Sequence, residues 1–185
     1  MEVFDRISDD LAAFIAEQPI FFVASAPLTG GHVNLSPKGL DTLRVVDPTT
    51  VAYLDMTGSG NETSAHLAEN GRLTIMFCSF SSRTMILRLY GRGRTVLPAD
   101  EEFAGLRARF EEIPGARQII VLEVDRVQTS CGYAVPRMDN ARARDTLVRW
   151  SERKGPEGLV AYQQEKNVVS IDGLPAPIGD ASSTK

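Results

Sequence analysis

The stretch from Val51 to Thr95 constrains the fold of this chain more than any other part. It reads in order as a strand (VAYLDM), a glycine-rich turn with a short helix (GSGNETSAHLAENG), and two further strands (RLTIMFCSF and TMILRLYGRGRT). Because free amides gather at a helix N-terminus, the turn from Gly58 to Asn61 predicts a place that holds an anion, commonly a phosphate. An ordinary glycine turn that only caps the helix is an equally good interpretation.

The composition indicates one compact domain. The chain has 185 residues, of which 43% are hydrophobic and 24% charged, so we expect a single domain over residues 1–185. A net charge of −4 argues against a nucleic acid or an anionic membrane as partner and favours a small molecule or a protein. Cys78 and Cys131 form no CxxC motif, and there is no basic leader or membrane-length apolar run, so we expect a cytoplasmic location.

The remaining chain is mainly β, with short helices. Ser8 can cap a first helix that Pro19 stops, Asp100 opens another that ends near Phe110, and the sequence between the second and third strand runs reads as a connection (DTLRVVDPTT). About six strands with so few helices favour an antiparallel sheet or barrel over a parallel one. The strand runs are 20–26, 32–36, 51–56, 72–80, 84–95 and 118–130, which places the core at about residues 20–130. The first two are expected to pair as a hairpin across the turn-rich segment 27–31, and the last is the longest.

The chain beyond Pro136 turns helical and polar. It includes ARARDTLVRWSERKG and EGLVAYQQEKN, which predict a covering element or arm over about residues 137–175. The last residues, 180–185, are polar and are expected to fray.

Two basic residues are candidates for an anion ligand. Arg88 lies within LRLYG, so it is either a surface residue on a half-exposed sheet or a ligand for an anion. Lys38 lies in SPKG, where a lysine is usually solvated, although the turn could present Ser36 and the Pro37 carbonyl to a ligand.

The histidines and cysteines indicate no metal site and no nucleophile. His32 and His66 lack metal-ligand spacing with a cysteine or with each other, and Cys131 has no neighbouring histidine. No Ser-His-Asp or paired-carboxylate arrangement follows from the spacings. The catalytic residues therefore stay unknown.

The order of these elements resembles the pyridoxamine 5'-phosphate oxidase-like, FMN-binding split-barrel proteins. In that family a strand leads to a turn with phosphate ligands, a short helix ending in Asn-Pro-Arg or similar, a strand ending in Phe and a strand ending in a Gly-containing pattern. The counterparts here are Asn70-Gly71-Arg72, Phe77 and Arg88-Leu89-Tyr90-Gly91, and VNLSPKG is similar to an early-strand variant of the family. The match covers about residues 21–130, and the order of the motifs carries it.

The resemblance implies a six-stranded antiparallel, Greek-key split β-barrel with peripheral helices and a helical C-terminal arm. It also implies a homodimer with FMN in clefts between the subunits. An early strand would face the isoalloxazine ring, a helix start would meet the phosphate, and an arginine would contribute from the adjacent strand. The implied cofactor-binding residues are Asn34, Ser36, Pro37 and Lys38 for the ring, Asn61, Glu62, Thr63 and Ser64 for the phosphate, and Arg88.

Two departures argue against pyridoxamine-phosphate oxidation itself. True oxidases carry a basic pair where this chain has Glu62-Thr63, so phosphate cations are absent unless Arg88, Lys38 or Arg44 takes over. A carboxylate at Glu62 also repels a phosphate unless it points outward. The oxidases further carry an arginine and a histidine near the C-terminus for the pyridoxal substrate, and no histidine follows His66 here.

The favoured function is an FMN-dependent oxidoreductase that passes a hydride between flavin N5 and an unidentified small molecule. One alternative is a non-catalytic flavin- or haem-binding or sensing module, for which His32 and His66 are the only histidines that could ligate iron. Another is a deazaflavin-dependent reductase. The sequence leaves all three open.

Overall fold

The structure is a computed structural model that describes residues 1–182, with side chains through residue 179. Residues 180–182 belong to a short 3₁₀ helix, whereas 183–185, the rest of the segment expected to fray, lie outside the described residues. In chain order the elements are β1 (Glu2–Phe4), α1 (Asp9–Ala16), β2 (Phe21–Ser25), β3 (Asn34–Lys38), β4 (Leu43–Asp47), β5 (Thr50–Met56), α2 (Glu62–Asn70), β6 (Arg72–Cys78), β7 (Ile86–Val96), α3 (Phe103–Arg107), β8 (Ala116–Ser130), α4 (Thr146–Lys166) and η1 (Pro177–Ser182). Among the described helices, none combines the length and the apolar character that a membrane crossing needs.

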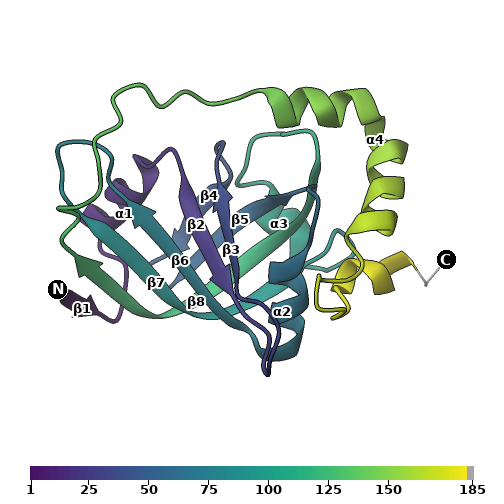
Figure 1. Ribbon diagram of the computed structural model, residues 1–185, viewed down its shortest axis with the longest axis horizontal. Coiled ribbons are helices and arrows are strands. Elements are labelled where there is room, and N and C mark those ends of the chain that lie inside the picture. The colour runs from purple at the N-terminus through teal and green to yellow at the C-terminus, as the bar shows by residue number, and fades with distance from the viewer. Residues whose placement is uncertain (183–185) are drawn as a thin grey trace.

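The strands form one strongly curved antiparallel sheet (Figure 1). Its order is β3-β2-β6-β7-β8-β5-β4, with β1 paired to the far end of β8. The end strands β3 and β4 each pair with one neighbour only, so the barrel is split and does not close. The predicted hairpin of β2 and β3 is confirmed, as is the prediction that β8 is the longest strand, at 15 residues.

The sheet has eight strands rather than the six expected. The stretch read as a connection contains β4, which pairs with β5 across a bulge between Val45 and Asp47. The residues from Leu43 to Val46 are all half-buried, so they lack the period-2 pattern by which a strand is recognised. The other addition, β1, has only three residues, and all are exposed.

One main hydrophobic core fills the inside of the curved sheet. Alternate residues of the strands point inward, among them Val23, Ile75 and Leu89, which are fully buried. The helix α1 adds Phe14 to the same cluster, and Ser8 caps it as predicted by accepting the Leu11 N–H. The core therefore begins well before residue 20. The helix expected from Asp100 to Phe110 is shorter than predicted, since α3 ends at Arg107.

The short helix α2 packs against β2, β6 and β7 through its buried face. It ends where the sequence predicted, at Gly71, which has a φ of 71° and donates its N–H to the Leu67 carbonyl. Its N-terminus lies directly after the glycine-rich turn that follows β5. This arrangement leaves the first turn of α2 beside β3 and the end of β5.

The C-terminal arm bends back toward α2. After β8 the chain crosses the molecule without regular structure and enters α4, which turns sharply (Figure 1). The turn occurs at Gly155, whose φ of 66° breaks the helix, and Pro156 starts the second half. Trp150 and Tyr162 pack edge to face across this corner, and the Lys154 ammonium lies over both rings. The corner directs the end of α4 to the glycine-rich turn.

Gly91, at the bulge where β7 pairs with β8, tests how closely these two strands approach each other. A Cβ on Gly91 would lie 1.9 Å from the Glu123 carbonyl oxygen, so Gly91→Ala forces the two strands apart. We expect a loss of about 3 kcal/mol in the free energy of unfolding, measured by urea denaturation. Gly105→Ala is the control, because nothing lies within 4 Å of its added Cβ. In helix α3 that change should stabilise by about 0.5–1 kcal/mol. Equal effects of the two substitutions would contradict the close approach.

Candidate functional site

A cavity of about 450 Å³ opens where β3, the end of β5 and the start of α2 meet. This size is within the usual range for a small-molecule site. Its wall is completed by Arg117 of β8 and by Ile171 of the C-terminal segment. The lining residues are Asn34, Ser36, Pro37, Lys38, Asp55, Met56, Gly58, Ser59, Gly60, Asn61, Glu62, Thr63, Arg117 and Ile171.

Strand β3 supplies a row of polar side chains. Because side chains alternate along a strand, Asn34, Ser36 and Lys38 point to the same side. The Ser36 hydroxyl donates to Asn34 Oδ1 at 2.9 Å, and Asn34 Nδ2 donates to Thr63 Oγ1 at 3.0 Å. Asn34 therefore ties the strand to the first turn of α2 and presents a fixed amide to the cavity.

A buried carboxylate joins two cations at the cavity floor. Lys38 Nζ lies 2.7 Å from Asp55 Oδ1, and Arg117 Nη2 lies 2.8 Å from Asp55 Oδ2. Gln118 Nε2 also donates to Asp55 Oδ2 at 2.8 Å. The side chains of Asp55 and Arg117 are only 2% and 3% exposed. Asp55 of β5 thus connects its own strand to β3 and β8.

The environment keeps Asp55 ionised. Burial alone raises the pKa of this carboxyl, but the charges of Arg117 and Lys38 outweigh it and hold the pKa well below its usual range. Each carboxylate oxygen has a cationic partner, so the charge is compensated inside the protein.

Hydrogen-bond donors remain free beside this cluster. Arg117 Nη1 is buried and has no partner among the described residues. The N-cap residue of α2, Asn61, does not cap the helix with its side chain, because Asn61 Oδ1 accepts from Gln118 Nε2 at 2.8 Å. The first amides of α2 are then available to an anion, and Arg117 lines the same cavity. Glu62 also lines the cavity, and its Oε2 accepts the Ile171 N–H at 2.9 Å.

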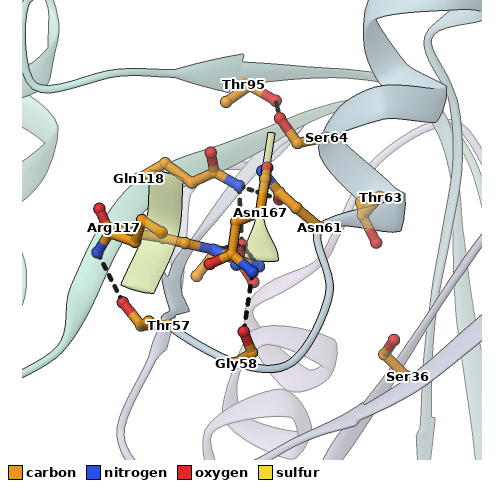
Figure 2. Close-up of polar contacts among 12 residues, drawn as sticks. Ser36, Thr57, Gly58, Asn61, Thr63, Ser64, Thr95, Arg117, Gln118 and Asn167 are labelled. Atoms are coloured by element: carbon orange, nitrogen blue, oxygen red, sulfur yellow. Dashed lines mark hydrogen bonds and ion pairs between the residues drawn. The ribbon is translucent and has the colours of Figure 1, made fainter. Parts of the chain in front are cut away.

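The end of α4 supports the turn from the other side (Figure 2). Asn167 Nδ2 donates to the Gly58 carbonyl at 2.9 Å, and the Asn167 carbonyl accepts from Asn61 Nδ2 at 3.0 Å. Gln163 Nε2 donates to Thr57 Oγ1 at 2.8 Å. The C-terminal arm therefore contacts the cavity of its own chain.

The structure brings together seven of the nine residues named as cofactor-binding from the sequence. Ser64 is not among the lining residues, because its hydroxyl bonds Thr95 Oγ1 at 2.9 Å and turns away from Thr63 (Figure 2). Its hydroxyl is therefore engaged away from the cavity, and its role as a phosphate ligand remains a prediction. Arg44 was the other cation expected as a possible replacement for the missing basic pair. Its Nη1 instead donates to Asp41 Oδ1 at 2.5 Å.

Arg88 also lies away from the cavity of its own chain. It is seven residues along β7 from Thr95, which contacts the start of α2, so about 23 Å of strand separates the two positions. Its Nη1 donates to Ser130 Oγ at 3.2 Å. Its role as a cofactor ligand remains a prediction that requires a second chain.

Sequence reasoning missed Asp55 and Arg117. A signal existed, since Asp55 is an acid inside an apolar strand and needs a buried cation. Strand register then identifies the region of that cation, because Asp55 pairs with Gln118. Neither histidine lines the cavity: the ring of His32 pairs with Asp172 at 2.7 Å, and His66 Nδ1 lies 3.0 Å from Ser25 Oγ.

The antiparallel split barrel, with a polar cavity at the start of a short helix, places this chain in the class of split-barrel proteins. Within that class, the family described as pyridoxamine 5'-phosphate oxidase matches residues 7–131 of this chain. A relative from Aspergillus flavus, the pyridoxamine 5'-phosphate oxidase family protein ustO, is 41% identical over 189 residues, covering 93% of this chain and 76% of the relative. The chain therefore belongs to the pyridoxamine 5'-phosphate oxidase family.

Solved structures agree on the fold. HupZ of Group A Streptococcus is 20% identical, with a TM-score of 0.53 over 75% of this chain and 99% of HupZ. A candidate pyridoxamine 5'-phosphate oxidase of Lactobacillus delbrueckii is 15% identical, with a TM-score of 0.56 over 69% of this chain and 99% of that one. At such identities the likeness shows the split barrel alone.

The Asp55 cluster predicts a pH-dependent stability. Asp55→Asn leaves buried Arg117 without its carboxylate, so we expect a loss of about 3–5 kcal/mol at pH 7 in urea unfolding. Because the folded pKa of Asp55 is depressed, its contribution is complete above the unfolded pKa of about 4 and is lost as the pH falls further. The difference between wild type and variant should therefore shrink below about pH 4.

The control for this prediction is Asp125→Asn, which alters an exposed carboxylate on β8. Its stability should stay within about 0.5 kcal/mol of wild type at each pH. A difference between wild type and Asp55→Asn that is constant down to pH 2 would contradict the assignment.

Proposed function

We propose that the cavity binds FMN and that the protein is an FMN-dependent oxidoreductase. The observation that carries the proposal is the buried Arg117 guanidinium, whose Nη1 has no partner among the described residues and which lines the same cavity as the uncapped start of α2. A cation and a set of amide donors that converge in this way suit a phosphate monoester.

The residues of the cavity fit a phosphorylated flavin. Arg117 and the first turn of α2 would hold the phosphate, and they compensate for the basic pair that Glu62 and Thr63 replace. Asn34 and Ser36 would hydrogen-bond the polar edge of the ring, since both side chains lie in the cavity wall. The turn contains only two glycines, without the third of a dinucleotide fingerprint, which favours FMN over FAD.

The bound flavin supplies hydride transfer through its N5 atom. The protein's own contribution is binding and orientation. Lys38 places a positive charge at the cavity wall, where it would stabilise negative charge on a reduced ring, and Asp55 keeps that lysine in place. The substrate is a small molecule that remains unidentified. We also infer a cytoplasmic location, which is supported by two free thiols, Cys78 and Cys131.

FMN binding is tested by reconstitution, acid release of the cofactor and chromatography. We expect FMN; recovery of FAD, or of no flavin, would overturn the proposal. Arg117→Lys retains the charge but removes the second donor of the fork, so FMN binding should weaken by about 1.5–3 kcal/mol in a fluorescence titration. The control Arg126→Lys, on the exposed face of the same strand, should bind FMN as wild type does.

We further infer that the protein is a homodimer. The outward residues of β2, β6 and β7 form a half-buried row in which Phe22 pairs with Met76 and Met76 with Arg88. A half-buried row that contains Phe22 and Met76 suits an isologous two-fold interface. Across it, Arg88 of one chain could contact the flavin of the other, which its distance from its own cavity does not allow.

The homodimer predicts that a charge in the centre of this row separates the subunits. Met76→Arg should reduce the mass measured by light scattering to that of one chain and should reduce flavin occupancy with it. Glu101→Arg alters an exposed residue before α3 and should change neither quantity. A Met76→Arg monomer with full flavin occupancy would show that each cavity is complete within one chain.

A further inference from the structure

The part of the chain beyond the family match supplies the support of the anion-binding turn. The match ends at residue 131, yet residues 163–171 make four hydrogen bonds to the segment from Thr57 to Glu62. Asn167 makes two of them, and it is 0% exposed. A fully buried amide with this placement is part of the site's construction.

The two contacts of Asn167 hold opposite ends of the glycine-rich turn. Its side chain binds the Gly58 carbonyl where the turn leaves β5, and its backbone carbonyl binds Asn61 at the N-cap of α2. Figure 2 shows Asn167 between these two residues, and Gln118 Nε2 donates to Asn61 Oδ1 at 2.8 Å. The path of the turn is thus fixed from both ends.

A turn of this composition needs such support. Gly58 and Gly60 have wide conformational freedom, so ordering them costs entropy that binding would otherwise have to supply. The side chain of Asn61 cannot cap α2, because Gln118 and Asn167 engage it. Preorganisation by the arm removes the ordering cost before the anion arrives.

We propose that Asn167 is a positioning residue for the phosphate-binding turn, and that the C-terminal arm gives the cavity its preference for a phosphorylated over an unphosphorylated flavin. This inference rests on the proposed binding of FMN. Asn167 does not line the cavity, so it acts through Gly58 and Asn61.

The test compares FMN with riboflavin, which has the same ring and no phosphate. Asn167→Ala should raise the Kd of FMN about tenfold, equivalent to about 1.4 kcal/mol, and leave the Kd of riboflavin within about twofold. Ser151→Ala is the matched control, since Ser151 is an equally buried arm residue whose hydroxyl has no partner among the described residues. It should preserve the preference for FMN. A merely structural role would weaken both ligands equally.

A second readout uses the protein without flavin. Asn167→Ala should accelerate amide hydrogen exchange at residues 58–64 about tenfold, with β6 and β7 unchanged, and Ser151→Ala should not. If wild type prefers FMN and Asn167→Ala retains that preference, the inference fails while the proposed function stands. If wild type binds no FMN, the proposed function fails. Unchanged exchange at residues 58–64 in Asn167→Ala would then also overturn the positioning role.

Discussion

The ion cluster centred on Asp55 is the interaction on which the site depends. It connects β3, β5 and β8 through Lys38 and Arg117, at the open edge where the sheet does not close. An unpaired charge at this depth would be costly, so each member requires the others. The cluster thus joins β3 and β5, which are not paired with each other in the sheet, through side-chain contacts. It also fixes the two cations in the wall of the cavity, so the stability of the fold and the proposed ligand binding draw on the same groups.

The sequence predicted the elements whose patterns are local. The order of strand, glycine-rich turn, helix and two strands is observed, as are the end of α2 at Gly71 and the hairpin of β2 and β3. It did not predict β4, whose half-buried residues have no alternation, nor β1, which is short and exposed. Those two strands account for the difference between six and eight.

The residues of the candidate site fall into the same two groups: those in local motifs were predicted, and those that depend on strand register were not. Asn34, Lys38 and Thr63 were identified because they belong to short recognisable motifs. Arg117 was missed because its partner Asp55 is 62 residues away, and only the register of β5 on β8 brings them together. The reach of the arm could not be read from sequence, because it depends on the direction that α4 takes after Gly155. Family membership explains the barrel, whereas the proposed phosphate ligand Arg117 lies outside the short motifs that carry the resemblance.

Because α4 turns at Gly155, the length of its second half determines where Asn167 lies. From Pro156 the helix runs to its C-cap at Asn167, and each residue advances it by about 1.5 Å and rotates it by about 100°. Inserting or deleting one residue there would turn Asn167 away from Gly58, whatever the residue's chemistry. The segment between β8 and α4 has no helical periodicity, so a change in its length would not rotate Asn167 about the helix axis. An insertion or deletion after the corner is therefore expected to displace Asn167, whereas one before α4 is expected to matter only if the segment no longer reaches that helix.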